Sequence, residues 1–372
     1  MFEGLLDPHN IPFWILVSSI IVVVIALISR SFVTNIIFAY PSAKFEAIGN
    51  PYITDKELNN ILVSKNLKEF MESLNSSKDY NVAGEDTYSI QKSLDENLIQ
   101  TIEMMRKDSS KKMNDFYDTY LEKIDIYLIK NELKKIFLGK TGEIDIDSAI
   151  LQKTKGFLYE LKDTSKENIS ELLKFYGFEK ELIEAFSSEK VDILTIDSII
   201  DKHIINRLEQ VEVPYRCEQA KQSFVKRFID IQNIKNVLRA KQLGYDSDTC
   251  KKLYLGEGKE IAHWKFNELT SLDQPPQVIA ALEGTSYFGV LKDSIELYNK
   301  DQSVQILENV LDSYFIKLIK DISIKNYLNL GPTLRFIVSK EYEIQNLKVI
   351  TKGVGESLSS DFIKRLLITE AG

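Results

Sequence analysis

The sequence has few of the residues that interrupt helices, with 16 glycines and 8 prolines in 372 residues. Average proteins use about 7% glycine and about 5% proline, so this chain holds roughly half of each. Hydrophobic residues make up 44% and charged residues 27%, which is ordinary for a folded protein. The composition therefore excludes a disordered or collagen-like chain and favours a helical body long enough for two or three domains.

Cysteine and histidine are scarcer still, and their placement excludes most metal chemistry. The two cysteines, Cys217 and Cys250, form no CxxC motif, so neither a disulfide framework nor a zinc site is expected. The three histidines, His9, His203 and His263, form neither an HExxH motif nor an i,i+4 pair. We therefore expect no metal and no other cofactor, and a reducing, cytoplasmic environment for the body.

Basic patches and catalytic motifs are also missing. The net charge is −8, with acidic and basic residues interspersed, which gives no electrostatic footprint for nucleic acid. Gly139-Lys140-Thr141 resembles the end of a P-loop, but Lys134 stands where that motif needs a glycine. Gly139 is therefore interpreted as a helix-ending glycine. The sequence predicts a protein with no catalytic site and no small-molecule substrate.

One long hydrophobic run is present, near the amino terminus. Ile11–Ser29 carries no charge and, as a helix, would span about 28 Å, close to the ~30 Å hydrocarbon core of a bilayer. A cleaved signal peptide or a buried core helix would be the alternatives, but a signal peptide opens with basic residues and this run follows Glu3 and Asp7. We predict a retained single-pass anchor within residues 1–39. Its predicted membrane residues include Ile11, Phe13, Trp14, Leu16, Val23, Ile25, Leu27 and Ile28.

Charges on either side of the run predict its orientation. Acidic Glu3 and Asp7 precede it, and basic Arg30 and Lys44 follow it. By the positive-inside rule, the carboxyl-terminal body lies on the cytoplasmic side of the cell membrane.

The remainder of the chain has a helical pattern throughout. We expect the first helix to end at Tyr40-Pro41, because the residue before a proline disfavours helical geometry, and the body to begin there. Thr54-Asp55-Lys56-Glu57 is a capping box before an apolar helix, and residues 301–320 have a wide apolar stripe. No convincing alternation of period two is present, so the predicted fold class is all-α.

An internal repeat is the most informative feature of the body. Residues 124–133, IDIYLIKNEL, return 105 positions later as residues 229–238, IDIQNIKNVL, and a looser copy, EIQNLK, occupies residues 343–348. This period exceeds the ~20–50 residues of solenoid repeats, so it indicates triplication of a small domain into one pseudo-symmetric body. The expected domains, with approximate boundaries, are residues 40–150, 151–260 and 261–372.

The repeated motif mixes apolar and charged positions. The apolar ones fall on one helical face, which we expect to be core. The shared acidic and basic residues are five apart and cannot form an i,i+4 pair. We favour a solvated surface for them, with inter-helix pairing within each small bundle as the alternative if they are partly buried. The motif residues are Asp125, Ile129, Lys130 and Asn131, then Asp230, Ile234, Lys235 and Asn236, then Asn346, Leu347 and Lys348.

Several segments together resemble one known family. The segment YPSAKFEA at residues 40–47, NIKNVLRAK at residues 233–241, LEGTSY at residues 282–287 and QNLKVITKG at residues 345–353 occur in the family's order. They resemble the C subunits of archaeal/vacuolar-type (A/V-type) rotary ATPases, the counterparts of the d subunits of eukaryotic V-ATPases. NIKNVLRAK is the most specific segment, and the resemblance runs from about Tyr40 to Leu367.

The resemblance implies a fold and a function. It implies three similar helical domains arranged as a funnel, which sits on the membrane proteolipid ring, receives the central stalk and transmits torque during proton- or sodium-coupled ATP synthesis or hydrolysis. Catalysis would belong to other subunits. Two other classes remain open: a membrane-tethered helical adaptor unrelated to rotary ATPases, and a membrane-anchored enzyme such as a hydrolase.

Overall fold

The computed structural model describes residues 8–9, 11–49, 53–77, 79–139, 144–165, 168–187 and 193–370. Across these ranges the regular structure is eighteen α-helices and a short 3-10 turn, with no strand, so the all-α prediction is confirmed. The orientation argument from Glu3 and Asp7 and the P-loop comparison at Lys140 and Thr141 rest on residues outside these ranges.

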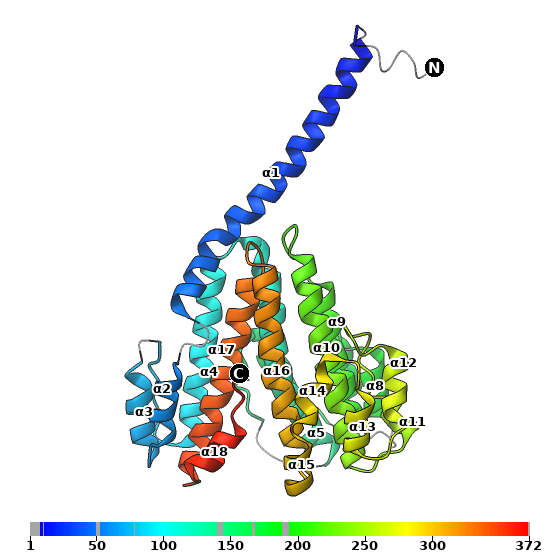
Figure 1. Cartoon of the computed structure of the whole chain (residues 1–372). Coiled ribbons are helices and arrows are strands. Elements are labelled where there is room, and N and C mark those ends of the chain that lie inside the picture. The colour runs from blue at the N-terminus through cyan, green and yellow to red at the C-terminus, as the bar shows by residue number, and fades with distance from the viewer. Residues whose placement is uncertain are drawn as a thin grey trace.

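Six long helices form three hairpins (Figure 1). Each long helix packs against the next one along the chain, and α17 packs back against α4, so the six close a circuit, which we call the helix circuit. The hairpins are α4 (Thr87–Asp108) with α5 (Asn114–Phe137), α9 (Ile193–Gln210) with α10 (Glu218–Gln242), and α16 (Val304–Lys325) with α17 (Gly331–Gly355). Helix α16 covers most of the predicted helix at 301–320.

Shorter helices lie between and beside the hairpins. Helix α2 begins with the predicted capping box, in which the Thr54 hydroxyl accepts from the Glu57 amide and the Glu57 carboxylate accepts from the Thr54 amide. Helix α18, near the carboxyl end, packs against both α17 and α2, so this group joins the two ends of the chain. The short helices are α2 (Asp55–Leu62), α3 (Leu67–Asn75), α6 (Gln152–Asp163), α7 (Ile169–Phe175), α8 (Lys180–Ser187), α11 (Ser247–Lys251), α12 (His263–Thr270), α13 (Pro275–Ala281), α14 (Ser286–Lys292), α15 (Ile295–Asp301) and α18 (Ser360–Leu366).

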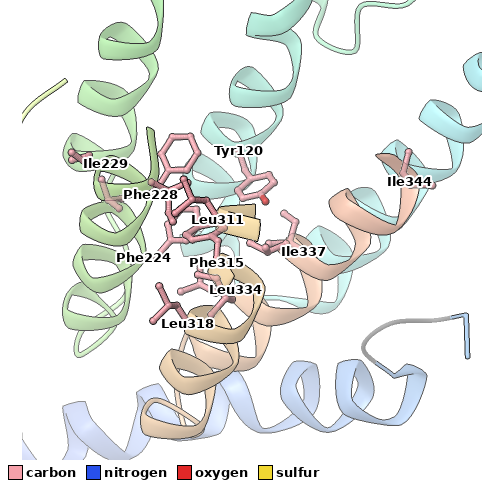
Figure 2. Packing of buried hydrophobic residues seen from close by; sticks show 14 of the residues in the cluster. Tyr120, Phe224, Phe228, Ile229, Leu311, Phe315, Leu318, Leu334, Ile337 and Ile344 are labelled. Atoms are coloured by element: carbon pink, nitrogen blue, oxygen red, sulfur yellow. The ribbon is translucent and has the colours of Figure 1, made fainter. Parts of the chain in front are cut away.

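The main hydrophobic core forms where four long helices converge. Figure 2 shows Tyr120 of α5, Phe224 of α10, Phe315 of α16 and Ile337 of α17 directed toward one another. The ring of Phe224 lies 6.4 Å from that of Tyr120 and 6.1 Å from that of Phe315. A second core joins the later half of α5 to α6, α7, α8 and α9. Burial of Tyr120, Phe224 and Phe315 in the main core stabilises the packing of the long helices of the circuit against one another.

The first helix, α1, is longer than predicted and runs from Ile11 to Ile48. The expected break at Tyr40-Pro41 is wrong, because Pro41 lies inside the helix. Pro41 and Ser42 are buried, and the Phe45 ring stacks on Phe336 of α17 at 4.8 Å. This tertiary packing outweighs the local preference of a residue that precedes proline.

Helix α1 leaves the body at the end where each hairpin turns (Figure 1). The three hairpin connections are residues 109–113, 211–217 and 326–330. At the second of them, the Tyr215 ring lies 4.4 Å from the Arg30 guanidinium. The carboxyl ends of α5, α10 and α17 therefore lie at the opposite end of the body, one helix length away.

Candidate functional site

The three copies of the repeat lie on α5, α10 and α17, one in each hairpin. The apolar positions Ile129, Ile234 and Leu347 are buried, as the periodicity predicted. Of the motif asparagines, Asn131 is exposed, whereas Asn236 donates to the Leu253 carbonyl at 3.2 Å. The buried apolar face is therefore common to the three copies, whereas the burial and contacts of the asparagines differ between copies.

The repeated lysines form ion pairs between neighbouring helices of the circuit. The solvated interpretation of Lys130 and Lys235 is wrong, because both are buried. They do pair with residues of other helices, but across neighbouring hairpins and not within one bundle, as the alternative expected. Lys348 of the third copy makes the corresponding contact. The pairs are Lys130 of α5 with Asp201 of α9 at 2.8 Å, Lys235 of α10 with Asp312 of α16 at 2.6 Å, and Lys348 of α17 with Asp95 of α4 at 2.5 Å.

The three aspartates of these pairs were not predicted from the sequence. A signal was present, since Asp95, Asp201 and Asp312 are 106 and 111 residues apart, close to the spacing of the lysines. Each pair joins the second helix of one hairpin to the first helix of the next, and the last joins α17 to α4. The same contact is thus made three times around the circuit.

The repeated acidic residues bind backbone amides. Asp125 accepts from the amides of Ile150 and Leu151, both at 2.8 Å. Asp230 accepts from the amide of Ile261 at 2.8 Å and, in the same way, from that of Glu260. Burial raises the pKa of both carboxyl groups, against the opposing effect of these amides. The solvated interpretation is wrong here too, because each side chain fixes the chain segment that follows its hairpin.

The long repeat helices also end alike. The residue after the last turn has a left-handed backbone at Gly139 (φ 64°), Gly244 (φ 74°) and Ser357 (φ 56°). Amides of these residues bond back into the last turn, as in a helix-ending motif. This confirms the interpretation of Gly139 as a helix-ending glycine. It also places a serine where the other two copies have glycine.

A buried charged cluster lies beside the third copy. The Lys340 ammonium donates to the Tyr80 hydroxyl at 2.7 Å and lies 3.5 Å from the Glu343 carboxylate, which also accepts from the Ile53 amide. Burial lowers the pKa of Lys340 to about 8, against the opposing effect of Glu343. The cluster ties the segment between α3 and α4 to α17.

The circuit is less tightly filled toward the carboxyl ends of α5, α10 and α17. Tyr120 is fully buried, but Tyr127, two turns later on the same face of α5, is 46% exposed. A cavity of about 330 Å³ lies there between α4, α5 and α17, and Lys92, Gln345 and Lys348 are among its lining residues. In the part of the chain that the structure describes, no three His, Cys, Asp or Glu side chains are grouped to hold a metal ion.

The predicted anchor residues all lie on the projecting part of α1. The 18-residue window that marks α1 as a candidate span, by length and composition, has no buried residue. Trp14 donates its indole N–H to the Pro8 carbonyl at 3.0 Å, and its ring packs edge-on against Phe13. Ile11, Leu16, Val23, Ile25, Leu27 and Ile28 are exposed.

This architecture defines a class: an all-helical protein in which a hairpin of long helices, joined to the next hairpin by a lysine–aspartate pair, occurs three times. Residues 41–366 match the ATP synthase (C/AC39) subunit family. The C subunit of the A-type ATP synthase of Methanocaldococcus jannaschii is 30% identical over 93% of this chain and 90% of its own length. Those of Methanobrevibacter smithii and Methanosphaera stadtmanae are 29% and 27% identical, over 90% and 93% of this chain and 88% and 91% of their own lengths.

The chain belongs to the C/AC39 subunit family of ATP synthases. This confirms the resemblance and, with it, the predicted function: the C subunit of an A-type ATP synthase, a non-catalytic stalk component of the rotary complex.

Proposed function

We propose that this protein couples the membrane proteolipid ring to the central stalk and transmits torque between them. Three similar helical domains, near residues 40–150, 151–260 and 261–372, form a pseudo-threefold funnel in this proposal. The threefold recurrence of the lysine–aspartate pair is the main support for these three domains, because one contact repeated around a closed circuit is what triplication of a domain would produce. Each proposed domain contains one hairpin.

The packing of the circuit supports a funnel that narrows toward α1. The aromatic core around Tyr120 and Phe224 fills the end near the hairpin connections. Toward the other end, Tyr127 becomes exposed and the cavity beside it begins. We assign the narrow end to the proteolipid ring and the wide end to the foot of the central stalk.

Charged contacts between helices suit the transmission of torque. Lys130 and Lys235 are buried and paired across helix boundaries, and Lys123 of α5 contacts Glu341 of α17 at 2.7 Å. Removing one partner of such a buried pair costs several kcal/mol, so the helices resist sliding past one another. A stiff funnel would transmit rotation from one end to the other with little deformation of its own.

Helix α1 is the proposed membrane anchor of this protein. Ile11–Ser29 has bilayer length, and its exposure leaves lipid or another membrane segment to cover it. A rotor component that turns with the ring cannot carry a membrane helix outside it, where the stationary part of the membrane sector would block each revolution. We therefore place α1 in the lumen of the ring, with the body on the cytoplasmic side.

Co-purification tests the proposed partners. An affinity-tagged full chain, expressed with the rest of the complex, should recover both the proteolipid ring and the central-stalk subunits. Deletion of residues 1–30 should lower recovery of the ring without abolishing it, because the tether mainly raises effective concentration. A chain that purifies from membranes without any other part of an ATPase would favour the adaptor alternative.

A further inference from the structure

The second and third copies of the repeat each hold a later segment of the chain through one asparagine. In the second copy, Asn233 of α10 donates to the Gly256 carbonyl and accepts from the Leu255 amide, both at 3.0 Å. In the third copy, Asn346 of α17 donates to the Ile368 carbonyl at 2.6 Å and accepts from the Ile368 amide at 2.8 Å. The two asparagines occupy the same position of the repeat, and each binds an amide 22 residues later.

The acidic residue of the repeat shows where the two copies differ. Asp230 accepts from the Ile261 amide, so one continuous stretch, residues 255–261, makes the contacts with both Asn233 and Asp230. Glu343, the counterpart of Asp230, accepts instead from the Ile53 amide at 2.9 Å, and these two residues are 290 positions apart. In the third copy, the two bound segments therefore come from distant parts of the chain, and no short stretch of backbone joins them.

Residues 367–370, which we call the strap, have few contacts of their own. Ile368 is held by Asn346, and the Glu370 carboxylate pairs with Lys320 of α16. The side chains of Lys320 and Glu370 are 41% and 30% exposed, so this ion pair adds little stability. Ile368 itself is only half-buried, whereas Leu255 is 2% exposed. The strap is therefore held less firmly than the stretch at residues 255–261.

A cavity lies beside the strap. It has a volume of about 250 Å³ and is bounded by the strap, α2, α16 and α17. Leu58, Ile316 and Leu347 give it apolar walls, and Ile368 also lines it. Because the strap faces this space, it lacks part of the close packing that a core segment has, and its release loses correspondingly less dispersion energy.

We propose that the strap is a releasable segment, bound in a site on α16 and α17 that accepts an extended peptide. Asn346 would recognise one amide and one carbonyl of the peptide backbone, the cavity an apolar side chain, and Lys320 an acidic side chain two residues later. Release of the strap would open this site to a segment of another protein with the same features. The strap thus acts as an internal competitor for that segment.

Hydrogen exchange of the full chain in mild detergent, followed by mass spectrometry, tests whether the strap opens by itself. The amides of residues 367–370 should exchange on the order of 100-fold faster than those of residues 255–256, after correction for intrinsic rates. Low concentrations of urea should not change the exchange rate of the strap, because a local opening exposes little surface.

Two matched variants separate the two copies. Asn346→Ala should remove the remaining protection of the strap and leave that of α17 unchanged. Asn233→Ala should lower the protection of residues 255–256 without releasing residues 255–261, because Asp230 still binds the amides of Glu260 and Ile261.

Peptide binding tests the site itself. A chain that stops after Leu366 should keep its helices and bind a labelled peptide of residues 367–372, LITEAG, in a saturable manner. Asn346→Ala in the shortened chain should weaken binding at least about tenfold, because two hydrogen bonds are lost. Glu370→Lys in the peptide should also weaken binding, because it places a cation against Lys320.

The opposite results overturn the inference. If the strap and residues 255–256 exchange at the same rate and with the same urea dependence, the strap opens only when the body unfolds. A shortened chain that loses its helices would likewise show that the strap is a fixed part of the body. If the shortened chain stays folded but the peptide does not bind, or binds equally well to Asn346→Ala, α16 and α17 hold no such peptide site.

Discussion

Replacing Lys235 with methionine should destabilise the body, because it leaves the Asp312 carboxylate without its cation between α10 and α16. The two side chains are only 7% and 12% exposed, and their charged atoms lie 2.6 Å apart. Removing one partner of a buried ion pair costs about 3–5 kcal/mol. Asp312 keeps the Tyr342 hydroxyl at 2.9 Å, so we expect a loss near the lower end of that range.

Two further variants turn this into a graded test. Lys348→Met breaks the corresponding pair with Asp95, whose side chains are 32% and 24% exposed, so it should cost about 1 kcal/mol or less. The double variant Lys235→Met/Asp312→Leu should recover most of the loss, because replacing both partners of a buried pair with apolar side chains is often neutral or stabilising.

Urea unfolding of the full chain in mild detergent, at constant ionic strength and followed by far-UV circular dichroism, measures these differences. Hydrogen exchange of α10 and α16 amides adds a local reading, in which 3 kcal/mol corresponds to roughly a 150-fold loss of protection. Equal losses for Lys235→Met and Lys348→Met, or no loss for Lys235→Met, would refute the argument from burial.

Three further predictions concern single sites. Asp230→Ala should lower the free energy of unfolding in urea by about 3–6 kcal/mol. It leaves the amides of Glu260 and Ile261 without an acceptor, at roughly 1–3 kcal/mol each, and removes the hydrogen bond from the Tyr287 hydroxyl. A loss below that of an exposed alanine control would contradict this prediction. Ser357→Gly should raise the free energy of unfolding by about 1 kcal/mol, since its φ of 56° is strained for serine, and an unchanged thermal midpoint would show that no strain is released. The pKa of Lys340 is about 8 in the folded protein, below the unfolded value of 10.5, so the unfolded state binds more protons between these pH values. The free energy of unfolding should therefore rise from pH 8 to 10.5 relative to that of Lys340→Met. Parallel pH profiles of the two proteins would contradict this.

Helix type and core positions were predictable because helical periodicity is local. Ile129, Ile234 and Leu347 recur at equivalent places in the repeat, and an apolar residue on one face of a helix nearly always faces a core. The capping box at Thr54 was predictable for the same reason, since all of its atoms lie within four residues.

Contacts between distant segments were harder to predict. The groups that bind Asp125 are backbone amides about 25 residues later, which leave no side-chain signature in the sequence. The helix through Pro41 depends on Phe45 meeting Phe336, almost 300 residues away, so the local rule gave the wrong boundary. Predicting the partners of the repeated lysines requires a second step, which is to search for aspartates that recur at about the same spacing as the lysines. Asp95, Asp201 and Asp312 meet this condition.

The position of α1 in the assembled enzyme tests the coupling account most directly. Cysteines introduced at Leu16 or Val23, both exposed on α1, can be crosslinked within the purified native assembly to cysteines on either face of the proteolipid ring. A protein that turns with the ring and carries its anchor in the lumen should crosslink to the inner wall. Crosslinks to the outer, stator-facing side would contradict the account.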